Sequence, residues 1–167
     1  NDRMSLEAIL KSAQLPPHLA KKPYLKENYG QIDWSVKALY QQNLGWFDAD
    51  ARHLYPIATE RAAVRMVKLA GGPQKVRTEI DKALQNGEPR WAVHLITMLQ
   101  QSSNIDDKTG NALLAKGLSA IAKTVENTNG KAYLLASSKQ LDESYVPPAI
   151  PNVSQEFMDA IPVETFV

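Results

Sequence analysis

The sequence contains no cysteine among its 167 residues. Disulfides, thiolate zinc sites and a cysteine nucleophile are therefore excluded, and the usual clue to the redox compartment is missing. An excess of one charge is also lacking, because 19 basic side chains are balanced by 18 acidic ones and the formal net charge is +1. This balance provides no long-range field that would attract nucleic acid, so we expect no nucleic-acid partner.

Long apolar runs are also missing. No stretch approaches the roughly 20 apolar residues that a membrane-spanning helix needs, so we expect no transmembrane segment. Strict apolar alternation with hairpin turns is absent, and strands should therefore be few. The length suits one domain. The chain nevertheless begins at Asn1 and ends in "IPVETFV", with apolar residues up to its last position, and we interpret it as a piece of a longer protein.

The common catalytic motifs are not found. The sequence has no P-loop, no dinucleotide glycine fingerprint and no GxSxG. Its histidines, His18, His53 and His94, are far apart and have no HxH or HxxxH partner; we interpret His94 as structural. The most metal-like cluster is Asp48, Asp50 and His53 in "DADARH", but aspartates in loops more often serve as turn and cap acceptors. We therefore predict no catalytic residue, no metal ligand and no cofactor in this chain.

Helix signals dominate what remains. Ser5, Asp33 and Thr59 are placed as N-caps before segments with helical periodicity, and Pro73 suits the first position of a helix. Short loops between successive helices predict an all-α array of antiparallel helical hairpins, with about seven helices. The predicted ranges are 6–13, 34–44, 60–70, 73–85, 89–101, about 107–126 and 131–143, followed by a short helix capped by Ser154.

Two features indicate how these helices pack. The segment 86–104, "NGEPRWAVHLITMLQQSSN", is similar to the second helix of a tetratricopeptide unit, although the flanking helices match that consensus poorly. We interpret this as tetratricopeptide-like packing rather than as a true repeat protein. Gly110 and Gly117 lie inside the long helix, where each costs about 1 kcal/mol relative to alanine. They predict a close approach of a neighbouring helix.

Aromatic residues are concentrated in one part of the chain. An ordinary core, a ligand pocket and a surface that meets another protein are all open interpretations of this excess. The helix at 34–44 is apolar on at least two sides, whereas an ordinary surface helix has one apolar stripe. We therefore expect it to be buried from more than one direction, by helices of its own domain or by another subunit. The aromatic residues are Tyr24, Tyr29, Trp34, Tyr40, Trp46, Phe47 and Tyr55.

The same stretch carries a family resemblance. In order along the chain stand "LPPHL" (15–19), "NYG" (28–30), "LGWFD" (44–48), "ER" (60–61), "AGG" (70–72) and "GEPRWA" (87–92). Together these segments resemble the helical dimerisation domain of the alkyl sulfatases of the metallo-β-lactamase superfamily. The resemblance implies a helical dimerisation domain over 1–145. It also implies that 146–167, with "IPVETF" (161–166), form a linker and the start of a lipid-carrier-like C-terminal domain.

The resemblance also implies a function. The parent enzyme would hydrolyse alkyl sulfate esters at a two-zinc site in a preceding domain, and this chain would be a non-catalytic homodimerisation domain that contacts that catalytic domain. If a residue of this chain reaches substrate, it would be Tyr29, which matches a tyrosine of the family motif; the alternative is a buried structural tyrosine. The alternative function is a tetratricopeptide-like scaffold for another protein, without sulfatase activity. The residues expected at the dimer interface are Trp34, Leu39, Tyr40, Trp46 and Phe47.

Overall fold

The computed structural model describes residues 4–48, 50–142 and 145–146. That part of the chain contains nine α-helices, one short 3-10 helix and no strand, which confirms the all-α prediction. The predicted C-terminal segment, including the helix capped by Ser154, lies outside the described residues except for Val146. The helices are α1 (Leu6–Ser12), α2 (Pro17–Ala20), η1 (Pro23–Leu25), α3 (Ile32–Leu44), α4 (Ala51–Leu54), α5 (Thr59–Leu69), α6 (Pro73–Gln85), α7 (Pro89–Gln101), α8 (Asp107–Thr124) and α9 (Thr128–Gln140).

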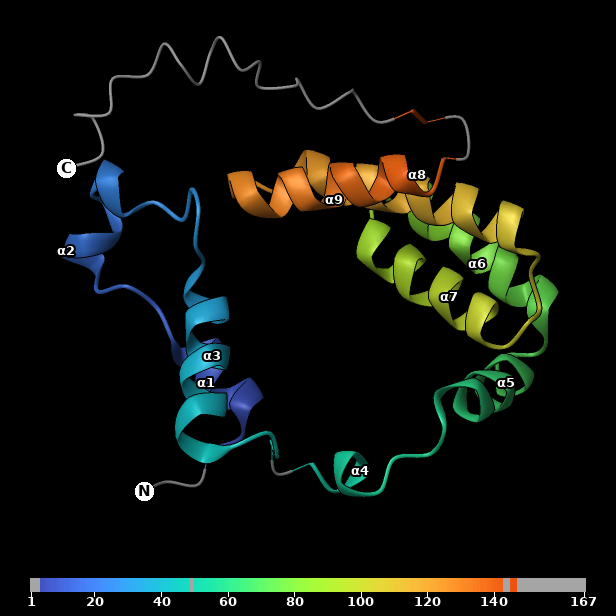
Figure 1. Ribbon diagram of the computed structural model, residues 1–167, viewed down its shortest axis with the longest axis horizontal. Coiled ribbons are helices and arrows are strands. Elements are labelled where there is room, and N and C mark those ends of the chain that lie inside the picture. The colour runs from blue at the N-terminus through green and yellow to red at the C-terminus, as the bar shows by residue number, and fades with distance from the viewer. Residues whose placement is uncertain (1–3, 49, 143–144, 147–167) are drawn as a thin grey trace, which may run out of the picture.

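Helices α5 to α9 form the packed part of the molecule (Figure 1). Within it α6 packs on α7, α7 on α8 and α8 on α9, so consecutive helices joined by short loops are neighbours, as the hairpin prediction requires. Tetratricopeptide-like packing stays an interpretation of this array. The buried cluster lies between α5, α6 and α7 and the turn before α8: Val67, Val76, Ile80, Ala83, Ala92, Leu95, Ile96, Leu99 and Ile105.

The two glycines of α8 lie at its contact with α7. A Cβ on Gly117 would stand 2.6 Å from Cγ2 of Val93, and one on Gly110 would stand 2.8 Å from Cγ of Gln100. Both distances are shorter than real Cβ contacts, so a side chain at either position would force Val93 or Gln100 to move. The predicted close approach is confirmed, and it explains why α8 keeps two residues that weaken a helix.

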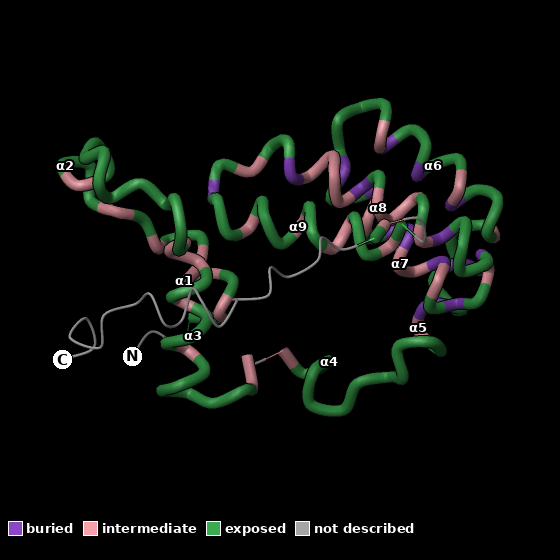
Figure 2. The backbone as a smooth tube through the Cα atoms, turned by 45° about the horizontal axis from the view of Figure 1, so that its top comes forward, coloured by how far each residue is buried: buried purple, intermediate pink, exposed green. Residues whose placement is uncertain are grey.

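Residues 4–57, which we call the arm, extend from this array (Figures 1 and 2). In the arm α3 packs against α1, and none of the residues that the structure describes there is buried. The array contains all the buried residues of the described chain, from Ala63 onward. About a third of the chain is therefore folded into helices without an interior of its own.

Several helix boundaries differ from the predictions. Helix α3 begins at Ile32 after Gln31, so Asp33 is a first-turn residue rather than the cap. Thr59 is likewise the first residue of α5, after Ala58. Asn127 caps α9, which therefore begins earlier than predicted. The predicted loop at 47–56 contains α4, a single turn that begins after Asp50.

Within the described residues, no helix combines the length and the apolar character that crossing a membrane requires.

Candidate functional site

The aromatic residues of the arm are largely uncovered. Trp46 is 68% exposed, and Tyr24, Trp34 and Tyr55 are exposed as well. Leu39 and Leu44 are further exposed large apolar side chains on α3. An ordinary core, one of the three interpretations of this stretch, is therefore wrong within the described chain. The arm therefore exposes many large apolar side chains, and clusters of such side chains are common where proteins meet other proteins or ligands.

Two of the five residues expected at an interface also support the arm internally. The phenol of Tyr40 donates a hydrogen bond to the carbonyl oxygen of Phe47 over 3.3 Å, and both side chains are half-buried. The ring of Trp46 meets that of Phe47 edge to face, with centroids 5.7 Å apart. This folds the loop after α3 back onto the helix and leaves Leu39 and Trp46 facing outward. The Trp34 ring is 40% exposed and lies beside Gly130 of α9. That the five residues form a dimer interface stays a prediction.

The junction between arm and array is built on Asn127, which is only 2% exposed. Its side-chain nitrogen donates to the carbonyl oxygens of Glu27, over 2.8 Å, and Gly30, over 3.0 Å. Its side-chain oxygen accepts from the backbone N–H of Gly130 over 2.8 Å, which caps α9. One amide thus satisfies both a helix end and a turn of the arm, and this fixes the arm against the start of α9.

Neighbouring residues complete the junction. The backbone N–H of Thr128 donates to the carbonyl oxygen of Asn28 over 2.7 Å. The side-chain nitrogen of Asn129 donates to the backbone carbonyl oxygen of Tyr29 over 2.8 Å. The backbone of Tyr29 is therefore held in place, while its side chain remains 70% exposed. The predicted role of Tyr29 at a substrate is compatible with this exposure and stays a prediction. Sequence reasoning missed the junction, because nothing in "ENTNG" indicates a partner in the arm.

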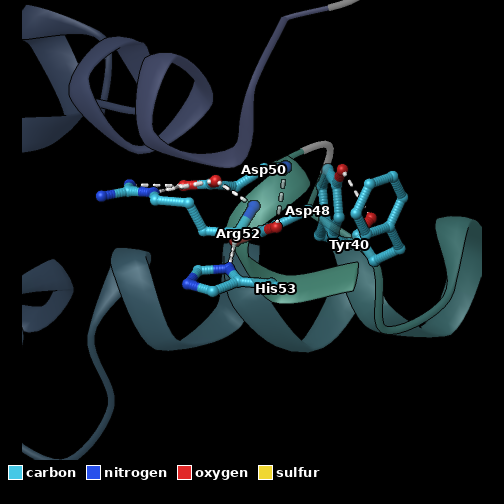
Figure 3. Close-up of polar contacts among 6 residues, drawn as sticks. Tyr40, Asp48, Asp50, Arg52 and His53 are labelled. Atoms are coloured by element: carbon cyan, nitrogen blue, oxygen red, sulfur yellow. Dashed lines mark hydrogen bonds and ion pairs between the residues drawn. The ribbon is translucent and has the colours of Figure 1, made fainter. Parts of the chain in front are cut away.

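Asp48, Asp50 and His53 already form hydrogen bonds and ion pairs with one another or with Arg52 (Figure 3). The carboxylate of Asp50 accepts from the backbone N–H of Arg52 over 2.9 Å, so it caps α4, and it also pairs with the Arg52 guanidinium. Nδ1 of His53 lies 2.7 Å from an oxygen of Asp48. The cap-and-turn interpretation accounts for these contacts, and among the described residues no group of three or more potential ligands is placed to hold a metal ion.

The electrostatics agree with this interpretation. The Arg52 side chain, followed by the Arg52 backbone N–H, holds the pKa of Asp50 far below its ordinary value. The backbone N–H of Asp50 lowers the pKa of Asp48, and His53 adds to the effect. Both carboxylates are therefore charged near neutral pH and already partnered. The other histidines are elsewhere: His18 lies on α2, and His94 on α7 stacks on Trp91 with ring centroids 5.5 Å apart.

Comparisons with known proteins identify the family of this chain. The profile of the alkyl sulfatase dimerisation family matches residues 5–144. A linear primary-alkylsulfatase of Pseudomonas sp. is 32% identical over 143 residues, which are 85% of this chain and 27% of that protein. An (R)-specific secondary-alkylsulfatase of Pseudomonas sp. is 28% identical over 135 residues, covering 81% of this chain and 20% of that protein.

A solved structure and a eukaryotic relative agree. The stereoselective inverting sec-alkylsulfatase Pisa1 from Pseudomonas sp. superposes with a TM-score of 0.76 at 27% identity, covering 99% of this chain and 26% of that one. An alkyl/aryl-sulfatase of Saccharomyces cerevisiae is 29% identical over 133 residues, which are 77% of this chain and 20% of that protein. The chain thus spans about a quarter or less of the length of the relatives it matches.

Proposed function

Because this chain belongs to the alkyl sulfatase dimerisation family, we propose that it is the self-association domain of a longer enzyme that hydrolyses alkyl sulfate esters. The relatives that it matches are named as alkylsulfatases, and the sequence resemblance leads to the same reaction. The domain would pair with a second copy of itself and would also contact the catalytic domain of its own chain.

The observation that carries this proposal is the arm. The described part of the arm has no buried residue. Most of the large exposed apolar side chains of the described chain nevertheless belong to the arm. Burial of apolar surface stabilises an association by roughly 25 cal/mol per Å² before the cost of association is subtracted. Covering the arm with a second copy would remove the exposed parts of Trp34, Leu39 and Trp46 from water and would give α3 a buried face, which it lacks in the single chain.

In this proposal, another domain of the parent enzyme carries out the hydrolysis. A zinc site is a proposal from the family resemblance, and the described residues do not fit it: the one loop with two aspartates and a histidine uses those groups to cap α4 and to pair with one another. In this proposal the chain acts through positioning. Tyr29, exposed and held at its backbone by Asn129, would form part of the wall of the substrate site.

The alternative of a tetratricopeptide-like scaffold is less well supported. A scaffold would use a groove in the helical array for its partner, and the arm would then have no role. The comparisons favour the enzyme-domain proposal, because the matched relatives are alkylsulfatases.

Self-association tests the proposal directly. Sedimentation equilibrium of the 167-residue chain should give twice the monomer mass of 18.5 kDa at micromolar concentration. Leu39→Asp, in the arm, should shift the chain toward monomer by at least tenfold in the dissociation constant. Leu135→Asp, a matched exposed leucine on α9, should not. A chain that stays monomeric at 100 times that concentration would contradict the proposal.

A further inference from the structure

A groove runs between α5, α6 and α7 of the array, and none of its lining residues belongs to the arm. It has a volume of about 470 Å³ and is lined mainly by apolar side chains. This volume lies within the range of roughly 300–1,000 Å³ that is usual for small-molecule sites. Its apolar wall includes Met66, Trp91, Leu95 and Met98, and its rim carries Lys75 and Lys82.

The apolar wall is accessible and adaptable. Val67, the neighbour of Met66 on α5, is buried, whereas Met66 is 53% exposed and lines the groove. Trp91 is 44% exposed, and its ring stacks on His94 with an angle of 16° between the planes. Methionine side chains adjust to irregular apolar ligands, and an indole adds a flat apolar surface. These are the properties of a wall that receives an alkyl chain.

The rim of the groove is positively charged. Lys75 and Lys82 stand two turns apart on α6, with Glu79 between them, so the α6 rim carries a net positive charge. None of these three side chains has an ion-pair partner in the part of the chain that the structure describes. The stem of Lys75 lies along the turn before α6, with Cδ 2.7 Å from where a Cβ of Gly71 would stand. Lysine stems can cover apolar surface while their ammonium groups remain in water.

We propose that this groove binds a single-chain anionic amphiphile, with its alkyl tail along Met66, Trp91 and Met98 and its head group at Lys75 and Lys82. The tail gains by leaving water, and the head group meets two unpaired cations. A neutral amphiphile keeps only the first contribution, and a cationic one meets repulsion. The inference does not rest on the proposed function, because the groove and the arm are separate surfaces.

Calorimetric titration of the 167-residue chain with sodium decane-1-sulfonate, below its micelle concentration, tests this proposal. We expect one saturable site, with affinity rising about two- to fourfold per methylene from octane- to decane-sulfonate. Decyl glucoside and decyltrimethylammonium should bind at least fivefold more weakly. The Trp91 indole N–H resonance, assigned with Trp91→Phe, should shift during the titration. Circular dichroism should show unchanged helicity at saturation, since the inference requires binding to the folded chain.

Matched variants locate the site. Lys75→Gln with Lys82→Gln should weaken binding about five- to tenfold, and Glu79→Gln should strengthen it about two- to threefold. Lys108→Gln with Lys116→Gln makes the same change in net charge at exposed positions of α8. The binding affinity of this variant should stay within twofold of that of the unsubstituted chain. Met66→Asp places a like charge on an exposed position of the wall and should abolish binding. Heats without saturation, or equal weakening by both lysine pairs, would overturn the proposal.

Discussion

The side-chain nitrogen of Asn127 donates to the carbonyl oxygen of Gly30 over 3.0 Å, across 97 residues of sequence. The same nitrogen also reaches Glu27, and the side-chain oxygen caps α9. Asn127 is buried, and both polar atoms of its side chain find partners within the chain. The hydrogen bonds that hold the arm against α9 thus come from a single amide and from two neighbours, Thr128 and Asn129, and the Trp34 ring lies beside Gly130.

Replacement of Asn127 should release the arm. Asn127→Ala removes the cap of α9 and both bonds to the arm, and we expect the free energy of unfolding to fall by about 2–4 kcal/mol. Asn127→Asp keeps an acceptor for Gly130 but no longer donates to Glu27 and Gly30, so the arm should loosen while α9 remains capped. Hydrogen exchange of residues 27–34 should then rise more than exchange within α9.

A capping control separates these effects. Asp106 caps α8 through the N–H of Thr109 and has no such connection to the arm. Asp106→Ala should therefore lower the free energy of unfolding by about 1 kcal/mol, the usual contribution of an N-cap, and leave amide hydrogen exchange at residues 27–34 unchanged. Equal loosening of the arm in the Asp106 and Asn127 variants would show that the junction is not specific.

The close approach of α7 and α8 can be tested with a pair of glycine substitutions. Gly117→Ala places a methyl group 2.6 Å from Cγ2 of Val93, and we expect a net loss of about 1–3 kcal/mol despite the better helix propensity. Gly130→Ala places its methyl group 3.4 Å from the Trp34 ring, an ordinary contact, and should be neutral or stabilising by up to about 1 kcal/mol. Urea denaturation of both variants measures the difference, and a stabilised Gly117→Ala would refute the close packing.

Acidification should loosen α4. The pKa of Asp50 is held below its ordinary value of 3.8, chiefly by the Arg52 side chain. A carboxylate whose pKa is lower in the folded state contributes its full stability above its unfolded pKa, and that contribution is lost as the pH falls toward the folded value. Carbon-13 chemical shifts of residues 51–54 should therefore move toward coil values below about pH 4.

Substitution of the carboxylates assigns this transition. Asp50→Asn keeps a capping side chain but removes the titrating group, so most of the change below pH 4 should disappear. Asp48, whose pKa is also lowered, should account for the remainder, and the variant with both substitutions should show a flat profile. A double variant that still unfolds α4 in the same window would contradict the assignment.

The outward-facing rings should matter for association and little for folding. Trp46→Ala removes an exposed side chain, so we expect the unfolding free energy of the monomer to change by less than about 0.5 kcal/mol. Truncation of a buried interface tryptophan typically costs 2 kcal/mol or more of binding energy, so the dimer should weaken by about thirtyfold or more. Tyr133→Ala, an exposed ring on α9, should change neither quantity. Light scattering across a dilution series and thermal unfolding measure the two effects.

Much of the helical architecture follows from local sequence. Ser5 accepts from the N–H of Ala8 as an N-cap should, Pro73 and Pro89 start their helices, and Gly45 ends α3 with a positive φ of 83°. These assignments depend on contacts within a few residues, which a sequence displays directly. The errors at Asp33 and Thr59 have the same scale, because a capping residue one position into a helix looks the same in sequence as one at its boundary.

The family resemblance likewise depends only on short segments of the sequence and on their order. Segments such as "LGWFD" and "GEPRWA" identify the family without any knowledge of how they pack, and the comparisons confirm that identification. The predicted dimer interface, the role of Tyr29 and the C-terminal segment stay predictions, since each depends on contacts outside the described chain.

By itself, then, the sequence determined that the chain is all-α, where the longer helices lie to within a few residues, and which family they represent; it missed the short helices α2 and α4. Only the tertiary structure decided that the aromatic segment has no interior, that Asn127 holds it against α9, and that Met66 lines a groove rather than the core. The physical reason is the range of the interactions. Capping and helical periodicity act over a few residues, whereas burial depends on which distant segments meet, and an amphipathic pattern does not specify its partner.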